Sequence, residues 1–325
     1  MKAAVNERYG SPDVLDIREL PVPNPQAGEI LVKVHATTVG RTDSCALRAH
    51  PFFVRPFSGL LRPRRKVLGL DFAGTVEAVG EGVTKFRQGN PVFGLTPGGY
   101  GAHAEYVCVP ADGAVCGMPA GKRFHEVVVC EGAWYANTFL KKFNLKPGHK
   151  ILIYGASGAI GTAAVQLSKF YGAEVTAVVS TRHLDLATRL GADHVVDYTA
   201  EDFSKIGQSF DFVLDAVGKT SYFQCRPLLE PNGVFAATDP GRWWQNIYLA
   251  IWSSLTGTGR VVFPTPRDAR SLVEFLKVRI DKGEFRGVVD RAYSLRNIAD
   301  AYRYVETGQK AGVVVIEVVP EDALR

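Results

Sequence analysis

The residues with the clearest chemical potential are the glycines of ILIYGASGAIGTAAVQL, residues 151–167. An apolar run with the composition of a buried strand precedes them, and an alanine-rich helical pattern follows. The first turn of a helix carries unpaired N–H groups and a partial positive charge, which attract phosphate. Glycines keep such a turn tight and let a pyrophosphate approach the backbone. The pattern predicts a dinucleotide site made by Gly155, Ala156, Ser157, Gly158, Ala159, Ile160 and Gly161.

The spacing of these glycines, GxxGxxG, differs from the usual GxGxxG fingerprint. Any tight connection from a strand to a helix can use glycine, so a purely structural turn is the alternative interpretation. The flanking strand, the flanking helix and the further strand–helix units downstream favour the dinucleotide site.

The end of the next strand bears on which dinucleotide binds. An NAD site places an Asp or Glu there, about 20 residues beyond the turn, to bind the ribose 2′-hydroxyl. This chain reads VVSTRH, with Ser180, Thr181 and Arg182 and no acid. A guanidinium with two hydroxyls suits a 2′-phosphate dianion, so the sequence favours NADP(H). A solvated loop charge is the alternative interpretation of Arg182.

The elements that position these residues show two different sequence patterns, one in the N-terminal part of the chain and one after it. About the first 120 residues carry short β-patterned runs broken by Gly and Pro, as in 29–39, 71–80 and 103–111. From Lys150 onward, strands made of continuous Val, Ile and Phe runs alternate with helices, which predicts a doubly wound parallel sheet. The C-terminal helices and last strand are expected to return to the first domain.

Composition limits the class of protein. The 325 residues are enough for about two domains, and the formal net charge of +5 suits a polyanionic small ligand as well as nucleic acid. Five scattered cysteines without a CxxC pair indicate neither a disulfide framework nor a zinc ribbon, and they favour a reducing compartment. No signal-peptide core and no run of about 20 apolar residues is found, so we expect a cytoplasmic protein.

Taken together, seven segments resemble the medium-chain dehydrogenase/reductase superfamily, specifically its zinc-free quinone oxidoreductase branch. They cover nearly the whole chain: YGSPDVLDIRELPVPNPQAGEILVKVHA, LGLDFAGTVEAVGEGVTKFRQGNPVFG, GAHAEYVCVPA, GASGAIGTAAVQLSK, LGADHVVDYTAEDF, FDFVLDAVG and IADAYRYVETGQKAGVVVIEV. The resemblance implies a GroES-like β-rich catalytic domain at residues 1–122 and 265–325, and a Rossmann domain at 123–264. It also implies hydride transfer and a homodimer formed through the strand GRVVF, residues 259–263.

Zinc can be tested against the motifs of the metal-dependent branch. That branch has a ligand Cys in Cys-x-Thr-Asp and a ligand His in Gly-His-Glu. This chain has Gly40 and Leu70 at those positions, and neither residue type can bind a metal. Since no Lewis acid is expected to polarise a ketone, the favoured substrate is an enone or quinone, whose conjugation helps it accept hydride.

The resemblance also implies positions for the cofactor. Tyr198 would lie beside the phosphate or adenosine, and Ala216, Val217 and Gly218 would pass the ribose. Two further residues would border the nicotinamide: Thr238 and Phe263.

The chain departs from the branch where the nicotinamide should lie. Gly40 stands where Asn is usual, and Cys130-Glu131-Gly132-Ala133-Trp134-Tyr135 replaces Pro-x-x-Gly-Leu-Thr-Ala. The candidate catalytic residues are Asp43, for which a structural hydrogen bond is equally open, and Tyr135. The candidate substrate-pocket residues are Gly40, Trp134 and Trp244.

Two other segments are open to several interpretations. Residues 52–66, FFVRPFSGLLRPRRK, are expected to form a lid or surface loop rather than a membrane or nucleic-acid contact. Residues 243–255, WWQNIYLAIWSSL, are expected to form a core or subunit-contact helix, with a wall of an apolar substrate pocket as the alternative.

The sequence as a whole predicts an NADPH-dependent, zinc-independent reductase of a small apolar enone, quinone or carbonyl compound. No nucleic-acid or membrane partner is expected. An alcohol or aldehyde oxidoreductase is one alternative. A protein that binds NADPH without turnover, with regulatory or RNA-binding work, is the other, because the motif at residues 130–135 is altered.

Overall fold

The computed structural model describes residues 1–50 and 55–319, which divide into two compact units. The first unit comprises Met1–Glu131 and Asp268–Arg325, and the second comprises Gly132–Arg267. The unit borders lie nine and three residues beyond the domain junctions expected at 122/123 and 264/265, and those junctions stay a prediction.

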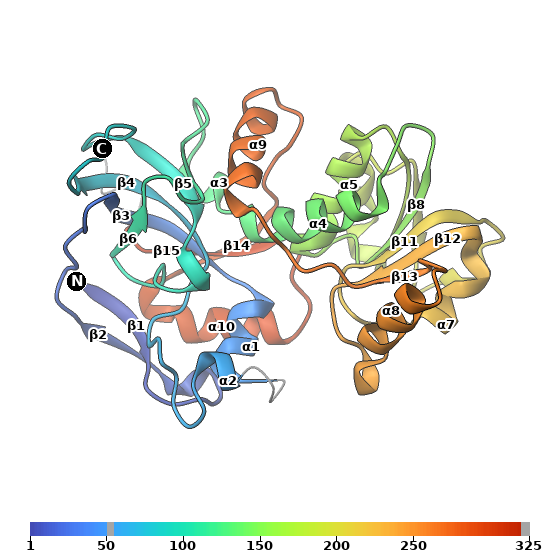
Figure 1. Cartoon of the computed structure of the whole chain (residues 1–325), viewed down its shortest axis with the longest axis horizontal. Helices are drawn as coiled ribbons and strands as arrows, with labels where there is room; N and C mark the ends of the chain where they lie inside the picture. Colours follow the sequence, from blue (N-terminus) through green and yellow to red (C-terminus); the bar gives the residue numbers. More distant parts are fainter. Residues whose placement is uncertain (51–54, 320–325) are drawn as a thin grey trace. The chain divides into compact units, whose positions relative to one another are not determined.

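The second unit is built on a six-stranded parallel sheet in the order β10-β9-β8-β11-β12-β13. Figure 1 labels β8, β11, β12 and β13 of this sheet. The direction of winding reverses between β8 and β11, which makes this the doubly wound arrangement expected from the sequence. Its strands are β8 (Lys150–Tyr154), β9 (Glu174–Val179), β10 (His194–Asp197), β11 (Phe210–Asp215), β12 (Leu229–Ala237) and β13 (Val261–Val262). Its helices are α5 (Ala159–Phe170), α6 (Leu184–Arg189), α7 (Tyr222–Cys225) and α8 (Gln245–Leu255), together with most of α4 (Cys130–Phe143).

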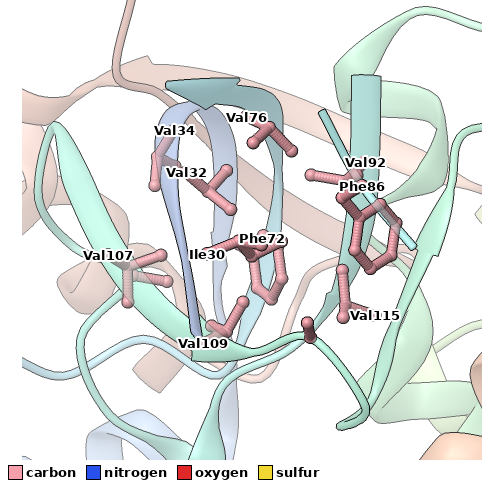
Figure 2. Close-up of a cluster of buried hydrophobic side chains, with 12 residues drawn as sticks. Ile30, Val32, Val34, Phe72, Val76, Phe86, Val92, Val107, Val109 and Val115 are labelled. Carbon is pink, nitrogen blue, oxygen red and sulfur yellow. The ribbon is translucent and has the colours of Figure 1, made fainter. Parts of the chain in front are cut away.

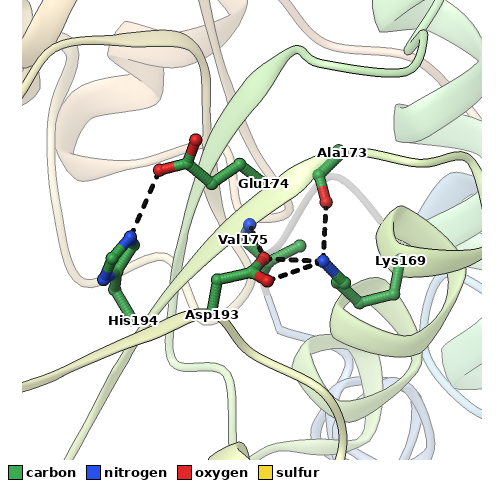
Figure 3. Close-up of polar contacts among 6 residues, drawn as sticks. All are labelled: Lys169, Ala173, Glu174, Val175, Asp193 and His194. Carbon is green, nitrogen blue, oxygen red and sulfur yellow. Dashed lines mark hydrogen bonds and ion pairs between the residues drawn. The ribbon is translucent and has the colours of Figure 1, made fainter.

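The central strand β8 explains why the glycine turn is held firmly. Ile151, Leu152 and Ile153 have no exposed surface, as expected of a strand covered on both faces. At the far end of α5, Lys169 bonds both carboxylate oxygens of Asp193 at 2.8 and 2.7 Å, and the same carboxylate accepts the N–H of Val175 (Figure 3). These contacts hold the C-terminal end of α5 beside the start of strand β9. The N-terminal end of α5 then lies at the carboxyl ends of the strands.

The first unit holds a seven-stranded mixed sheet in the order β14-β15-β3-β4-β5-β7, with β6 paired to β3, and a separate β1–β2 hairpin. Valines, Ile30 and Phe72 fill the core of the sheet (Figure 2). Its strands are β1 (Lys2–Asn6), β2 (Leu15–Glu19), β3 (Glu29–Val39), β4 (Asp71–Val79), β5 (Pro91–Leu95), β6 (Tyr106–Pro110), β7 (Val115–Gly117), β14 (Val289–Ser294) and β15 (Val313–Glu317).

The C-terminal tail returns to the first unit, as the sequence predicts. Strand β15 pairs antiparallel with β3, and Val314 faces Val39. Tyr302 of α10 is fully buried against this sheet, in a cluster with Val314. The helices of this unit are α1 (Arg41–Arg48), α2 (Arg55–Ser58), α3 (Phe124–Val127), α9 (Ala269–Asp281) and α10 (Ile298–Glu306).

Two segments with open interpretations can now be placed. Of residues 52–66, positions 52–54 lie outside the described residues; 55–58 form α2, and Leu60 and Leu61 after it are exposed. Residues 245–255 form α8, and the core interpretation is wrong, because Tyr248, Trp252 and Leu255 are exposed. The subunit-contact interpretation stays a prediction. No helix in the described part of the chain is long and apolar enough to cross a membrane.

Candidate active site

The glycine turn joins β8 to α5, and two of its glycines are required by the protein's own packing. A Cβ on Gly161 would lie 2.2 Å from the carbonyl oxygen of Gly155 and 2.6 Å from the Cα of Ala156. Gly155 has φ +74°, and a Cβ there would lie 2.6 Å from Val217 Cγ1. No side chain fits at either position.

Gly158 differs from the other two glycines. Its φ is −74°, and a Cβ there would have its nearest neighbour at 3.6 Å, an ordinary contact. It is the N-cap of α5, and the N–H groups of Ala159, Ile160 and Gly161 have no carbonyl one turn earlier in the helix to bond. The fold thus tolerates a side chain at Gly158, and the bare backbone there leaves room for an anion to approach those N–H groups.

The turn after β11 lies directly beside the glycine turn, since Val217 packs on Gly155. The buried carboxylate of Asp215 shapes it by accepting the N–H groups of Val217 and Gly218 at 3.0 and 2.8 Å, and the Thr220 hydroxyl at 2.8 Å. The sequence analysis did not single out Asp215, although an acid at the end of a strand, three residues before a glycine, was visible in LDAVG.

The structure therefore brings together the residues predicted for the pyrophosphate (155–161) and for the ribose (216–218). Thr238 follows β12 and joins the same edge, because its N–H donates to the carbonyl of Asp215 at 3.0 Å. Phe263 follows β13 and instead lines a groove beside α8.

The residues predicted for the 2′-phosphate gather at the ends of β9 and β10. The Thr181 hydroxyl donates to Asp197 at 2.6 Å and lies 2.8 Å from the Thr199 hydroxyl. The Ser180 hydroxyl lies 3.4 Å from a ring nitrogen of His183, and Arg182 is exposed. Sequence reasoning missed Asp197, because it belongs to the neighbouring strand. Hydrogen bonds from Thr181 and Thr199 lower the pKa of Asp197 and keep it ionised.

An aromatic cavity opens next to these residues. Its volume is 440 Å³, and Tyr154, Tyr198 and Phe203 contribute rings to its lining. The rings of Tyr154 and Tyr198 are 5.8 Å apart between centroids, and Tyr198 is about half exposed. The cavity lies beside the residues predicted for the 2′-phosphate, and its rings offer an apolar contact surface to a flat ring.

In the first unit, three carboxyl groups come together around Gly40. Asp43 accepts the N–H groups of Gly40 and Gly69 at 2.8 and 3.2 Å. Asp71 accepts the N–H of Glu131 at 2.9 Å. A Cβ on Gly40 would lie only 2.5 Å from Glu131 Oε2, so the Glu131 carboxylate occupies the space into which a side chain at position 40 would project. The sequence analysis quoted Glu131 without assigning it a role.

Burial governs the charge of this cluster. It raises the pKa of Asp43 to about 7 and the pKa of Glu131 to about 7, and the nearby Asp43 adds to the effect on Glu131. Burial, with the nearby charge of Glu131, also raises the pKa of Asp71 well above its usual value. Burial lowers the pKa of the neighbouring Lys310 to about 8. Carboxyl groups this close share protons at neutral pH instead of both ionising.

The remaining candidates lie in the second unit. The indole N–H of Trp134 donates to the carbonyl of Arg267 at 2.8 Å, and its ring meets Tyr135 edge-on at 6.4 Å between centroids. Trp244 precedes α8 in the left-handed conformation, with φ +64°. Gly40 and Asp43 belong to the other unit.

The residues at the two ligand positions of the zinc branch do not fit a zinc ion. Gly40 offers no side chain, and Leu70 offers a buried aliphatic one. Within residues 1–50 and 55–319, no group of three or more His, Cys, Asp or Glu residues is placed to hold a metal.

A glycine turn at the switch point of a doubly wound parallel sheet is typical of dinucleotide-binding folds. Residues 26–120 match the family model described as "Alcohol dehydrogenase GroES-like domain", and residues 190–316 match the one described as "Zinc-binding dehydrogenase". A zinc-type alcohol dehydrogenase-like protein of Schizosaccharomyces pombe is 30% identical, over 95% of this chain and 94% of that protein. The chain belongs to the medium-chain dehydrogenase/reductase superfamily and is an oxidoreductase of that superfamily, as its sequence indicated.

Other relatives carry more specific names. The NADPH-dependent alkenal/one oxidoreductase of Arabidopsis thaliana chloroplasts is 28% identical, over 98% of this chain and 80% of that protein. The solved quinone oxidoreductase from Coxiella burnetii superposes with a TM-score of 0.86 and 25% identity, over 98% of this chain and 99% of that one. These relatives belong to the class of reductases that the sequence predicts.

Proposed function

We propose that this chain is an NADPH-dependent reductase that delivers hydride to an activated double bond or a quinone without a metal ion. The observation that carries the proposal is the β8–α5 turn, in which packing requires Gly155 and Gly161 while Gly158 leaves the helix N-terminus open. The names of the alkenal/one and quinone oxidoreductases support the substrate class. The residues at positions 40 and 70, Gly40 and Leu70, support the absence of zinc.

A nicotinamide dinucleotide bound in the second unit supplies the hydride. In the proposal, the N–H groups at the start of α5 bind its pyrophosphate, and Ser180 and Arg182 bind its 2′-phosphate. Tyr154 and Tyr198 offer their rings to its adenine. The Thr181 hydroxyl donates to Asp197 and therefore orients the loop rather than donating to phosphate.

The chain also needs a proton for the carbon or oxygen that becomes basic after hydride addition. Glu131 is partly exposed and has a pKa near neutrality, so its carboxyl can hold that proton at pH 7 and release it. Asp43 is buried and holds the backbone of Gly40 and Gly69, so we assign it a positioning role. Tyr135 stays an alternative donor.

The test is an NADPH-oxidation screen over enones, quinones and aldehydes, run with and without a chelator. We expect turnover of at least one enone or quinone, unchanged by the chelator. Loss of activity on chelation, together with stoichiometric zinc in the protein, would contradict the metal-free proposal. Tight NADPH binding without oxidation by any compound would favour a binding protein.

Cofactor choice gives a separate prediction. Losing a charge-assisted phosphate contact costs about 1.5–3 kcal/mol, so Arg182→Ala should weaken NADPH binding by some tens-fold and leave NADH binding almost unchanged. The exposed Arg189→Ala on α6 is the matched control and should change neither affinity. Fluorescence titration measures both. Equal NADPH and NADH affinities in the wild type would reject the 2′-phosphate assignment.

Assembly and location complete the proposal. Strand β13 is the edge of its sheet, and an unpaired edge invites a second copy of the chain, although Pro264 and Pro266 limit the length of pairing. We propose a homodimer in the cytoplasm, and the scattered cysteines without a CxxC pair support that location. Light scattering at micromolar concentration should give the mass of two chains, and a purely monomeric mass would contradict the dimer.

A further inference from the structure

One stretch of the first unit carries positive charge and no acid. Residues 44–70 contain no Asp or Glu. Arg48 pairs with Glu306 at 2.6 Å and Lys66 pairs with Glu7 at 3.1 Å, so these two cations are neutralised from elsewhere in the chain. The stretch therefore keeps a net positive charge, which attracts anions. Its other cationic side chains are Arg55, Arg62, Arg64 and Arg65.

The fold places Arg65 against an aromatic ring. The guanidinium carbon of Arg65 lies 5.9 Å from the centre of the Tyr100 ring, within the range of a cation–π contact. Arg65 is exposed and Tyr100 is partly buried. In the part of the chain that the structure describes, no carboxylate pairs with Arg65, and the Tyr100 hydroxyl makes no hydrogen bond. Both side chains can therefore donate to a ligand.

A neighbouring pair, Arg55 and Tyr9, has a different task. Arg55 lies over the Tyr9 ring at 5.4 Å. The Tyr9 hydroxyl, however, donates to the carbonyl of Gly59 at 2.8 Å and lies 2.8 Å from the Ser58 hydroxyl. Its proton is already used to hold the loop that follows α2. Tyr9 thus supports the loop on which Arg65 lies, and it is not available as a donor.

Backbone hydrogen bonds fix the two segments that bring Arg65 and Tyr100 together. The carbonyl of Leu68, three residues after Arg65, accepts the N–H groups of Gly101 and His103 at 3.2 and 2.9 Å. The loop that carries Tyr100 is thereby attached to the segment that carries Arg65. The pairing of the two side chains is therefore built into the backbone of the first unit.

The same segment reaches the carboxyl cluster of the candidate site. Asp43 accepts the N–H groups of Gly40 and Gly69 at 2.8 and 3.2 Å. Burial raises the pKa of Tyr100, and the nearby Tyr9 and Asp43 add to the effect. The Tyr100 hydroxyl therefore stays protonated at neutral pH and remains a donor. All these residues belong to the first unit, so the donors lie in the same unit as Gly40.

We propose that Arg65 and Tyr100 bind a carboxylate group of the substrate, so that the enzyme acts preferentially on anionic enones. A planar guanidinium binds both oxygens of a carboxylate, and the phenol hydroxyl supplies a further donor. The inference rests on the proposed reductase function and narrows its substrate class, which the sequence analysis gave as apolar. It also gives a task to residues 55–66, part of the segment expected to form a lid or surface loop.

The first test compares benzoylacrylate, an enone that carries a carboxylate, with its methyl ester. In Arg65→Gln, the KM for benzoylacrylate should rise about ten-fold, because a charge-assisted hydrogen bond is lost, and the KM for the ester should change much less. Tyr100→Phe should act in the same direction with a smaller effect. Arg62→Gln is the matched control, because it removes the same charge from the same loop at an exposed position. Thermal unfolding checks that all three variants are folded.

A binding measurement separates this inference from the proposed function. Benzoylpropionate is the saturated counterpart of benzoylacrylate and has no activated double bond. Calorimetry in the presence of NADP⁺, which cannot donate hydride, should show about ten-fold weaker binding of benzoylpropionate to Arg65→Gln than to the wild type or to Arg62→Gln. If no enone is reduced, the proposed function fails, while this measurement still tests the carboxylate site.

Three results would overturn the carboxylate site. One is an equal loss for benzoylacrylate and its ester in Arg65→Gln. Another is an equal loss in Arg65→Gln and Arg62→Gln, which would assign the effect to the general positive charge of the loop. The third is a wild type that does not bind benzoylpropionate.

Discussion

Gly161→Ala should destabilise the second unit by about 2 kcal/mol and abolish detectable NADPH binding. Alanine normally gains about 1 kcal/mol over glycine inside a helix, so helix propensity alone gives the opposite sign. The new methyl group, however, would lie 2.2 Å from the Gly155 carbonyl oxygen and 2.6 Å from the Ala156 Cα. These are backbone atoms, which cannot rotate away, so the turn itself must open. Urea unfolding and fluorescence titration measure the two effects.

The matched control lies in the same turn. Gly158→Ala places its methyl group 3.6 Å from the nearest atom at a φ that alanine readily adopts, so the free energy of unfolding should change by less than about 1 kcal/mol. NADPH binding should nevertheless weaken, since the methyl group lies where a pyrophosphate approaches the helix. If Gly158→Ala binds NADPH as well as the wild type does, the turn is structural and the proposed function loses its main support.

The contrast between these glycines shows what the sequence could supply. The turn was predictable because strand, glycines and helix are adjacent in the chain. Val217, which packs on Gly155, lies some 60 positions away, and only the pairing of β8 with β11 brings it there. The same holds for Asp197, which reaches Thr181 from the neighbouring strand.

Residues 245–255 illustrate a second limit. Their periodicity correctly indicated a helix with two distinct sides. Apolar side chains usually face inward, and that rule made the core one of the two expected places for the aromatic side, the other being a subunit contact. In the structure the helix has the opposite orientation, because Asn246 and Ser253 are buried and form hydrogen bonds with residues of the flanking segments. Glu131 was missed for a related reason: its carboxylate matters because position 40 has no side chain, and the two residues lie 91 positions apart.

The second large effect concerns Glu131. Between pH 5 and pH 8, the Glu131→Gln variant should lose less stability than the wild type does. Burial raises the pKa of Glu131 from 4.5 to about 7, so over this range the folded chain binds more protons than the unfolded chain. The contribution of Glu131 to stability is therefore fully present below pH 4.5 and is lost as the pH rises through 7. The shift corresponds to about 2–3 kcal/mol, which the glutamine variant should not lose.

Other titrating groups bear on the size of this effect. Glu131 faces the carboxyls of Asp43 and Asp71, accepts a hydrogen bond from Thr42 and is attracted by Lys310. The pKa of Lys310 is lowered to about 8, so it starts to titrate only at the upper end of the range. His35 and His103 have their pKa lowered to about 4 by burial and affect wild type and variant alike. Their contribution cancels in the difference.

Urea unfolding of wild type, Glu131→Gln and the exposed control Glu201→Gln at pH 5, 6, 7 and 8 measures the effect. As the pH rises, the free energy of unfolding of the wild type should fall relative to that of Glu131→Gln. The Glu201→Gln variant should follow the wild type at every pH. Parallel curves for all three would show that Glu131 has an ordinary pKa.

If Glu131 also delivers the proton, kcat for an enone should fall in Glu131→Gln while the Kd for NADPH is unchanged. The wild-type decline of kcat/KM above pH 7 should disappear in the variant, because glutamine has no proton to lose. A variant that keeps that decline would move the proton donor to another group, with Tyr135 the first to test.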